Sequence, residues 1–180
     1  GACSAVLALM QQVGVDPRQV LLRRPLALRW ADGRGLELSP GPPAWAFARA
    51  VLRCGAWTVA ERLRLLARGA AWLASGWRCA PTLSVDALCA SLPASVRQLL
   101  IDPLCVAALN TPAREASAAV FLRLLQDGLL GGPGASDLLL PRRPLHELLP
   151  GPATHWLAAH GATLQPGRRV QPRRVLAQNA

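Results

Sequence analysis

The histidines are the first residues to consider as metal ligands, because neutral imidazole is a common metal ligand in proteins. The chain has three of them, His146, His155 and His160. His155 and His160 are five residues apart, whereas two ligands on one face of a helix are three or four apart, and His146 is isolated. The spacing therefore predicts surface or capping histidines, and we expect no metal site.

Four carboxylates are candidates for acid–base chemistry: Asp102, Glu115, Asp127 and Asp137. Nothing in their spacing brings them to one site, and Asp137, directly after Ser136, is expected to order a turn or cap a helix. The sequence contains no Gly-x-Ser-x-Gly, the turn that presents a catalytic serine in many hydrolases. These residues by themselves assign no catalytic group.

A glycine-rich segment at Gly131-Gly132-Pro133-Gly134 has the composition of a phosphate-binding loop. Such loops follow a strand and, in the nucleotide-binding P-loop, end in a lysine. This segment follows a predicted helix, and the chain has no lysine at all. We expect a plain loop here.

Tryptophans and arginines alternate between residues 45 and 78 in an otherwise apolar sequence. Aromatic rings at headgroup level and guanidinium groups on lipid phosphate are typical of helices that rest on a membrane. Two amphipathic helices with tryptophans in the core would give the same pattern, and both interpretations stay open. The candidates for membrane contact are Trp45, Trp57, Trp72 and Trp77.

Composition narrows the class of ligand. Hydrophobic residues make up 52% of the 180 residues and charged residues 17%, which is more apolar material than one core of this size requires. The surplus is expected to face a ligand, a membrane or another domain. The net charge of +10 is spread along the chain, and tyrosine is absent. We therefore expect no nucleic-acid partner, because a dedicated groove needs clustered charge and aromatic platforms.

The cysteines indicate a reducing compartment. Five of them, an odd number with no Cys-x-x-Cys pair, lie mostly among apolar neighbours, so buried free thiols are expected. The longest stretch without charge, residues 148–167, is interrupted by proline and glycine and cannot be a spanning helix. The chain has no start methionine and is expected to be a piece of a longer protein. We predict a cytoplasmic location, with peripheral contact on the inner face of the cytoplasmic membrane as an extension of that prediction.

Local signals place the elements that must position these residues. A helix is predicted from Ser4 to Gln12, closed by Gly14, followed by a hairpin of strands 21–30 and 36–38 around Asp32-Gly33. In the first strand Leu26, Leu28 and Trp30 share an apolar face. Residues 39–43 form a loop rich in proline.

Helices follow, at residues 45–54, 58–75, 84–90 and 95–109. A capping box, Thr58-Val59-Ala60-Glu61, begins the second of them, and Pro103 is expected to kink or split the last. Thr111-Pro112 predicts a further helix over 113–125 with Ala116, Val120 and Leu124 on one stripe, and then a loop over 128–134. Short helices at 145–149 and 153–159 and a closing strand at 168–175 complete the chain. The fold class predicted is α+β, predominantly helical, with helices packed on a small antiparallel sheet.

Several blocks of sequence are shared with one known family. They are residues 101–112, which end in Leu-Asn-Thr-Pro, Glu-Ala-Ser-Ala at 115–118 with Phe121, Ser-Asp-Leu-Leu-Leu-Pro at 136–141, Leu-Leu-Pro at 148–150, Trp-Leu-Ala-Ala-His-Gly-Ala at 156–162, Gly-Arg-Arg-Val at 167–170, Pro-Leu-Ala-Leu at 25–28 with Asp32-Gly33, and Gly-Ala-Cys at 1–3. In these blocks the chain resembles the squalene-associated flavoproteins, the hydroxysqualene dehydroxylases of bacterial hopanoid synthesis. That family belongs to the superfamily of flavin amine oxidases and phytoene desaturases. The resemblance covers nearly the whole chain.

The resemblance implies a two-domain flavoenzyme in which a helical substrate domain interrupts an FAD-binding sheet. Residues 1–160 would be the substrate-binding or cap domain, and residues 161–180 a strand returning to the FAD-binding domain. Arg169 and Val170 match that strand near the cofactor. The Gly-rich dinucleotide fingerprint is absent, so FAD is expected in the full-length parent and none in this piece. The partners implied are the FAD-binding domain and a large isoprenoid.

The resemblance also limits the site. Relatives usually have Glu at position 102 and Tyr at position 3, where this chain has Asp102 and Cys3, so no catalytic residue is assigned. The lack of a lysine favours the isoprenoid branch over amine oxidation. The activity implied is reduction of hydroxysqualene to squalene, or desaturation of squalene or phytoene. A dry apolar tunnel would hold the substrate, and its expected lining residues, which could equally be ordinary core, are Leu104, Val106, Leu109, Phe121 and Leu124. The alternative function is that of a non-catalytic helical module that binds a membrane surface or another protein.

Overall fold

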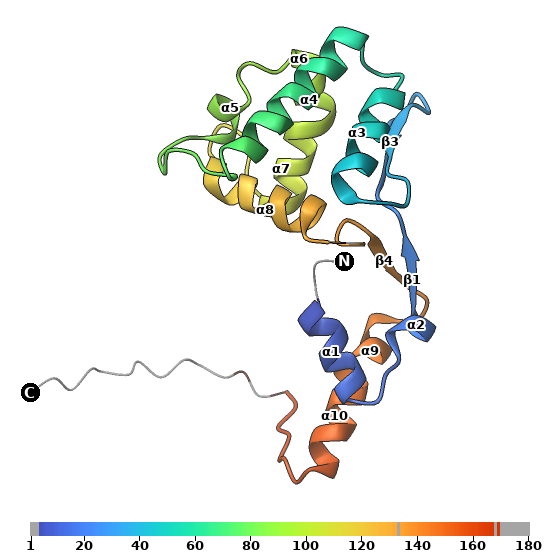
Figure 1. The fold of residues 1–180 in the computed structure, drawn as a ribbon. Coiled ribbons are helices and arrows are strands. Elements are labelled where there is room, and N and C mark those ends of the chain that lie inside the picture. The colour runs from blue at the N-terminus through green and yellow to red at the C-terminus, as the bar shows by residue number, and fades with distance from the viewer. Residues whose placement is uncertain (1–3, 133, 168, 170–180) are drawn as a thin grey trace, which may run out of the picture. The chain divides into compact units, whose positions relative to one another are not determined.

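A computed structural model describes residues 4–132, 134–167 and 169 (Figure 1). Helices dominate the described chain, and its short strands form two-stranded sheets, β1 with β4 and β2 with β3. The predicted class, α+β and mostly helical, is confirmed. The chain divides into two compact units, one of Gly1–Ser4 and Leu22–Leu140, the other of Ala5–Leu21 and Pro141–Ala180. The predicted boundary at residue 160 does not coincide with this division.

The smaller unit consists of short helices: α1 (Ser4–Gln12), α2 (Pro17–Val20), α9 (Leu145–Leu148) and α10 (Pro150–Ala159). Helix α1 ends at Gln12, before Gly14, as predicted, whereas Ser4, expected as its cap, is its first helical residue. Asp16 begins α2, because its carboxylate accepts a hydrogen bond from the Arg18 backbone N–H at 2.9 Å. Met10, Val20 and Leu148 form the buried centre of this unit.

The larger unit contains the predicted hairpin, formed by β2 (Ala27–Arg29) and β3 (Gly35–Glu37). The strands are antiparallel with Leu28 opposite Leu36, and Gly33 takes the positive φ of 79° that the turn needs. At Gly35 a Cβ would lie 2.3 Å from the Leu28 carbonyl oxygen, so only glycine fits there. The apolar face predicted for the first strand is confirmed, since its leucines and Trp30 pack against the core.

The predicted single strand over residues 21–30 is wrong. The strand is interrupted at Pro25, which has no backbone N–H to donate to a neighbouring strand. The part before the break, β1 (Leu21–Arg24), pairs with β4 (Leu138–Pro141), a strand that the sequence pattern did not indicate. Asp137, expected in a turn or cap, lies just before β4 and forms an ion pair with Arg23 of β1 at 3.1 Å.

Two helices follow the hairpin, α3 (Pro43–Arg53) and α4 (Val59–Ala74). The predicted capping box of α4 is confirmed. The Glu61 backbone N–H donates to the Thr58 hydroxyl at 3.3 Å, and the Thr58 backbone N–H donates to the Glu61 carboxylate at 2.7 Å. The Ser95 hydroxyl also donates to this carboxylate, which links the start of α4 to a later segment.

The predicted helix over 95–109 is interrupted before Pro103. After α5 (Val85–Leu88) the chain forms α6 (Ala94–Val96), a π-helical segment η1 (Arg97–Ile101) and α7 (Asp102–Leu109). A proline cannot donate to the carbonyl four residues earlier, which here is that of Leu99. That carbonyl oxygen accepts a hydrogen bond from Trp30 Nε1 at 3.1 Å instead. Pro103 thus frees an acceptor that joins this segment to the hairpin.

The next helix, α8 (Ala118–Leu130), begins later than predicted. The expected start at Thr111-Pro112 is wrong because the backbone of residues 113–118 is paired with residues 83–86. The N–H of Val85 donates to the Ala116 carbonyl, and that of Ala118 to the Leu83 carbonyl. The helix also continues through Gly128, where a loop was expected. Its buried face differs from the predicted stripe, since Val120 is 54% exposed.

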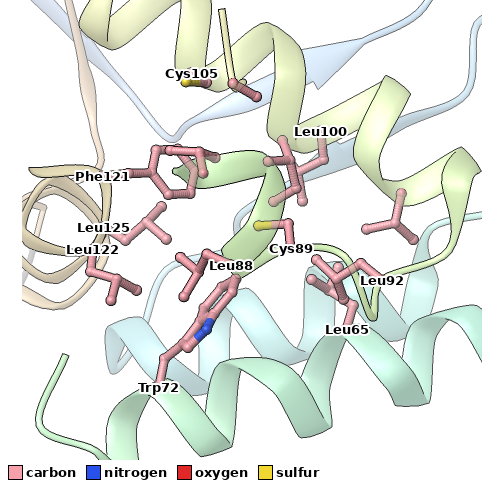
Figure 2. Close-up of a cluster of buried hydrophobic side chains, with 14 of the residues drawn as sticks. Leu65, Trp72, Leu88, Cys89, Leu92, Leu100, Cys105, Phe121, Leu122 and Leu125 are labelled. Atoms are coloured by element: carbon pink, nitrogen blue, oxygen red, sulfur yellow. The ribbon is translucent and has the colours of Figure 1, made fainter. Parts of the chain in front are cut away.

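The main core lies in the larger unit (Figure 2). Helix α3 contacts α4, α8 and β3, and α8 also contacts α5 and α7. Figure 2 shows side chains from α4, α5, η1, α7 and α8 pointing toward one another, and its labelled members are Leu65, Trp72, Leu88, Cys89, Leu92, Leu100, Cys105, Phe121, Leu122 and Leu125. This packing of helices around the hairpin frames the site described next.

Candidate functional site

A cavity of about 520 Å³ lies within the larger unit. Its size is within the range of about 300–1,000 Å³ that is usual for ligand pockets. The hairpin, α3, α4, the end of η1, α7 and α8 all contribute side chains to it, and the lining residues are Leu26, Leu28, Leu36, Leu38, Ala44, Phe47, Ala48, Leu65, Leu66, Gly69, Ala70, Trp72, Leu73, Trp77, Leu100, Ile101, Leu104, Leu124, Leu125, Gly128, Leu129, Ala135 and Ser136. Leu73 is also 54% exposed, so the cavity opens to solvent beside the C-terminal half of α4.

The lining is almost wholly apolar. None of the lining residues carries a charge, and Ser136 alone brings a hydroxyl. The indole Nε1 of Trp72 is buried without a hydrogen-bond partner in the described chain, so this ring contributes apolar surface rather than a donor. Ser136 and Leu38 also line a second, smaller cavity of about 260 Å³. Such a lining favours a neutral, apolar ligand, because a charged one would lose its hydration without a compensating partner.

The backbone after α4 places a second tryptophan in the cavity wall. The Gly76 N–H donates to the Leu73 carbonyl at 3.0 Å and the Trp77 N–H to the Trp72 carbonyl at 2.8 Å, which is the Schellman arrangement at a helix end. Gly76 supplies the positive φ that this ending requires, at 63°. Trp77 also has a positive φ, 60°, which is rare for a bulky residue. The strain is offset where the Trp77 ring packs against the core and lines the cavity.

Comparisons with known proteins add no family to this geometry. The chain matches no known family model and no curated protein. The resemblance to the squalene-associated flavoproteins therefore stays a prediction.

The structure separates the five predicted substrate-binding residues. Leu104 and Leu124 line the cavity. Phe121 is fully buried in the core, and Leu109 packs against that core without reaching the cavity. Val106 was misplaced: it is 51% exposed, because residues two apart on a helix face different ways and Leu104 is the one that faces inward.

The four candidate membrane-contact tryptophans divide in the same way. Trp57 and Trp72 are 2% and 6% exposed and belong to the core, so they cannot rest on a membrane in this fold. Trp57 packs edge-on against Trp30 with ring centroids 5.7 Å apart. Trp77 is half-buried in the cavity wall, and Trp45 is 71% exposed. For Trp57 and Trp72, therefore, the second interpretation of the tryptophan pattern, side chains in the core, is the right one.

The candidate acid–base residues are engaged elsewhere. Three of them form surface ion pairs with different arginines: Glu115 with Arg114, Asp127 with Arg123 and Asp137 with Arg23. Asp102 begins α7, directly after the π-helical segment η1. In the described part of the chain no group of histidine, cysteine and carboxylate side chains could hold a metal ion. None of the four carboxylates lines the cavity.

Burial lowers the acidity of two cysteine thiols in the larger unit. Cys54, Cys89 and Cys105 are buried, Cys79 is half-buried, and all four are free. Burial raises the pKa of the Cys89 thiol to about 12 and also raises the pKa of Cys105. The sequence prediction of buried free thiols is confirmed for Cys54, Cys89 and Cys105. The raised pKa makes Cys89 and Cys105 poor nucleophiles at neutral pH.

Of the two residues predicted near the cofactor, the structure describes only Arg169. Arg169 is exposed and stands in no strand, while Val170 and most of the predicted strand 168–175 lie outside the described residues. The Gly131–Gly134 segment follows α8 and precedes β4, so it does not join a strand to a helix as a dinucleotide loop does.

Sequence reasoning missed part of the cavity wall. Leu28 was assigned only to an apolar strand face, and Phe47, Gly69 and Gly128 were not singled out. A usable signal was present in the two glycines, which stand inside α4 and α8 where alanine would favour the helix by about 1 kcal/mol.

None of the helices in the described segments is both long and apolar enough to cross a bilayer.

Proposed function

We propose that this chain is the substrate domain of an FAD-dependent oxidoreductase that acts on a long isoprenoid. The observation that carries the proposal is the cavity of about 520 Å³ with no charged side chain in its lining. Burying apolar surface there stabilises a bound hydrocarbon by roughly 0.8 kcal/mol per methylene. The resemblance to the squalene-associated flavoproteins narrows this class to hydroxysqualene, squalene or phytoene, with reduction and desaturation both as candidate reactions.

The described residues do not fit FAD itself. A dinucleotide site needs a parallel strand, a glycine-rich turn and a helix, whereas the strands here pair only as β1 with β4 and β2 with β3 within the described chain. The cofactor therefore belongs to another domain in this proposal. The role of the present residues is to hold the isoprenoid, keep it from water and present it to that domain.

Binding to the 180-residue chain gives the first test. Squalene delivered from cyclodextrin is expected to change the tryptophan fluorescence, because Trp72 and Trp77 line the cavity. Leu104→Gln, which places an amide in the wall, should weaken binding about tenfold or more. Val106→Gln on the exposed face of the same helix is the matched control and should bind as the parent does. Equal loss in both variants, or no saturable binding at all, would contradict the proposal.

Expression of the whole gene tests the enzyme. A yellow product with a flavin spectrum that forms squalene from hydroxysqualene and a reductant supports the dehydroxylase branch. A yellow product that instead desaturates squalene or phytoene supports the other branch. A colourless, folded product would overturn the flavoenzyme proposal.

A second candidate function, a membrane-surface module, has one observation in its favour. Three large apolar side chains are each more than half exposed, Trp45 on α3 and Val59 and Leu63 on α4. Arg49 and Arg53, also on α3, are exposed as well. Apolar side chains flanked by arginine suit an anionic lipid surface. Sedimentation with phosphatidylglycerol vesicles tests it: Trp45→Ala should reduce binding several-fold, and uncharged phosphatidylcholine vesicles are the control. Equal binding to both lipids, or no effect of the substitution, would count against this function.

A further inference from the structure

Two glycines stand in the wall of the cavity at positions where helices rarely use glycine. Gly69 lies inside α4 and Gly128 inside α8, and neither has a positive φ. Glycine inside a helix is unfavourable relative to alanine, because it loses more backbone freedom on folding. Some local requirement is therefore expected to keep these positions without a side chain.

Packing does not supply that requirement. A Cβ built at Gly69 or at Gly128 meets no atom within 4 Å. The contrast is with Gly35 and Gly131, where a Cβ would lie 2.3 Å and 2.2 Å from a backbone oxygen. At those two positions the neighbouring chain excludes a side chain. At Gly69 and Gly128 there is room, and the cavity is what both residues line.

We propose that Gly69 and Gly128 determine which ligands the cavity accepts, by keeping its width open for a long hydrocarbon chain. This inference rests on the proposed function and deepens it. Other small residues also line the cavity, among them Ala44, Ala48 and Ala70. Most of the other lining residues are large and apolar, leucines above all.

The inference predicts an opposition between stability and binding. Gly69→Ala and Gly128→Ala should each raise Tm by about 2–4 °C, since alanine favours the helix and the added methyl meets no neighbour. Gly69→Leu and Gly128→Leu should weaken squalene binding at least tenfold, because a leucine side chain displaces several methylenes of the ligand. Farnesene, half the length of squalene, should bind all variants within about threefold of the parent.

The experiment is a titration of the full chain with squalene and with farnesene, followed by tryptophan fluorescence. Ala67→Leu on α4 and Ala119→Leu on α8 add the same side chain at exposed positions outside the cavity, and both should bind squalene as the parent does. Circular dichroism of each variant shows whether it is folded.

The outcomes separate the two proposals. If the parent binds neither hydrocarbon, the proposed function fails, and this inference fails with it. If the parent binds squalene and the leucine variants bind it equally well, the function stands and the role of the two glycines is overturned. Loss of squalene and farnesene together in the leucine variants also overturns it, because the glycines would then affect binding in general rather than ligand length.

Discussion

At the scale of single residues, the state of the cysteines is open to direct measurement. Cys89 is fully buried and its pKa is raised to about 12, whereas Cys79 is only half-buried. A rise from 9 to 12 lowers the thiolate fraction at pH 8 roughly a thousandfold. We expect iodoacetamide to label Cys79 in the native chain while Cys89 stays unmodified, as measured by peptide mass spectrometry.

Unfolding in guanidinium chloride is the control for this labelling, since it should make both thiols reactive. Labelling of Cys89 at the rate of Cys79 in native buffer would mean that the cluster around α5 opens readily, contrary to its burial.

The residues of the cavity show how far sequence alone reaches at this scale. An apolar run on a helix indicates that some of its side chains face inward, and Leu104 and Leu124 are half-buried and line the cavity. The run does not indicate which side of the helix faces a core and which a cavity. Phe121 and Val106 were chosen by the same signal, yet one is in the core and the other faces solvent. That choice depends on where the neighbouring helices pack.

At the scale of elements, the capping box of α4 is expected to carry measurable stability. Thr58→Ala removes the acceptor for the Glu61 N–H and should lower the free energy of unfolding by about 1 kcal/mol. Urea denaturation followed by circular dichroism measures the difference. Thr82→Ala, at an exposed position outside any helix, is the matched control and should change it by less than about 0.5 kcal/mol. Equal effects of the two substitutions would contradict a capping role.

The same cap gives a dependence on pH. The pKa of Glu61 is lowered, first by the hydrogen bond from the Ser95 hydroxyl and then by those from Thr58. A carboxyl with a lowered pKa in the folded state stabilises the fold above its unfolded pKa, near 4.5, and loses that contribution as the pH falls through the folded value. The urea midpoint should therefore fall less between pH 6 and pH 3 in Glu61→Gln than in the parent. Parallel curves for the two proteins would show that this carboxylate has no part in acid sensitivity.

The link between the hairpin and η1 can be tested with matched substitutions of tryptophan. Trp30→Phe keeps a ring but leaves the Leu99 carbonyl without its indole donor. The cost should be about 1–2 kcal/mol in the free energy of unfolding. Trp45→Phe, on the exposed surface of α3, should be nearly neutral in the same urea measurement. A neutral Trp30→Phe would show that this hydrogen bond does not hold the hairpin to the helices.

Local signals predicted the elements where the neighbouring residues alone decide the structure. The capping box, the Asp-Gly turn of the hairpin and the interruption before Pro103 belong to this group. The start of α8 was predicted wrongly because Thr111-Pro112 is a good local start, yet the backbone of residues 113–118 bonds to residues 83–86. Strand β4 was missed for a similar reason, since its pairing partner β1 lies more than a hundred residues away in the sequence.

At the scale of the whole molecule, the composition indicated a surplus of apolar residues but not where it would lie. Part of it forms the cavity wall, where leucines from the hairpin and three helices meet. Part is exposed, on α3, α4 and several other elements, and part forms two separate buried clusters. Such partition depends on contacts between distant segments, so a periodicity within any one segment cannot reveal it.

The two clusters lead to a prediction for unfolding. One lies wholly in the unit of residues 22–140 and includes Leu122, while the other, around Met10, Val20 and Leu148, lies wholly in the second unit. The second cluster buries far less apolar surface, so its unit should unfold first, and calorimetry should show two transitions. Met10→Ala should lower the unfolding free energy of the smaller unit alone, and Leu122→Ala that of the larger unit alone, each by roughly 2–5 kcal/mol. Hydrogen exchange measured by mass spectrometry assigns each transition to its residues. A single transition lowered equally by both substitutions would show that the units fold as one, and cavity variants would then report on the stability of the whole chain.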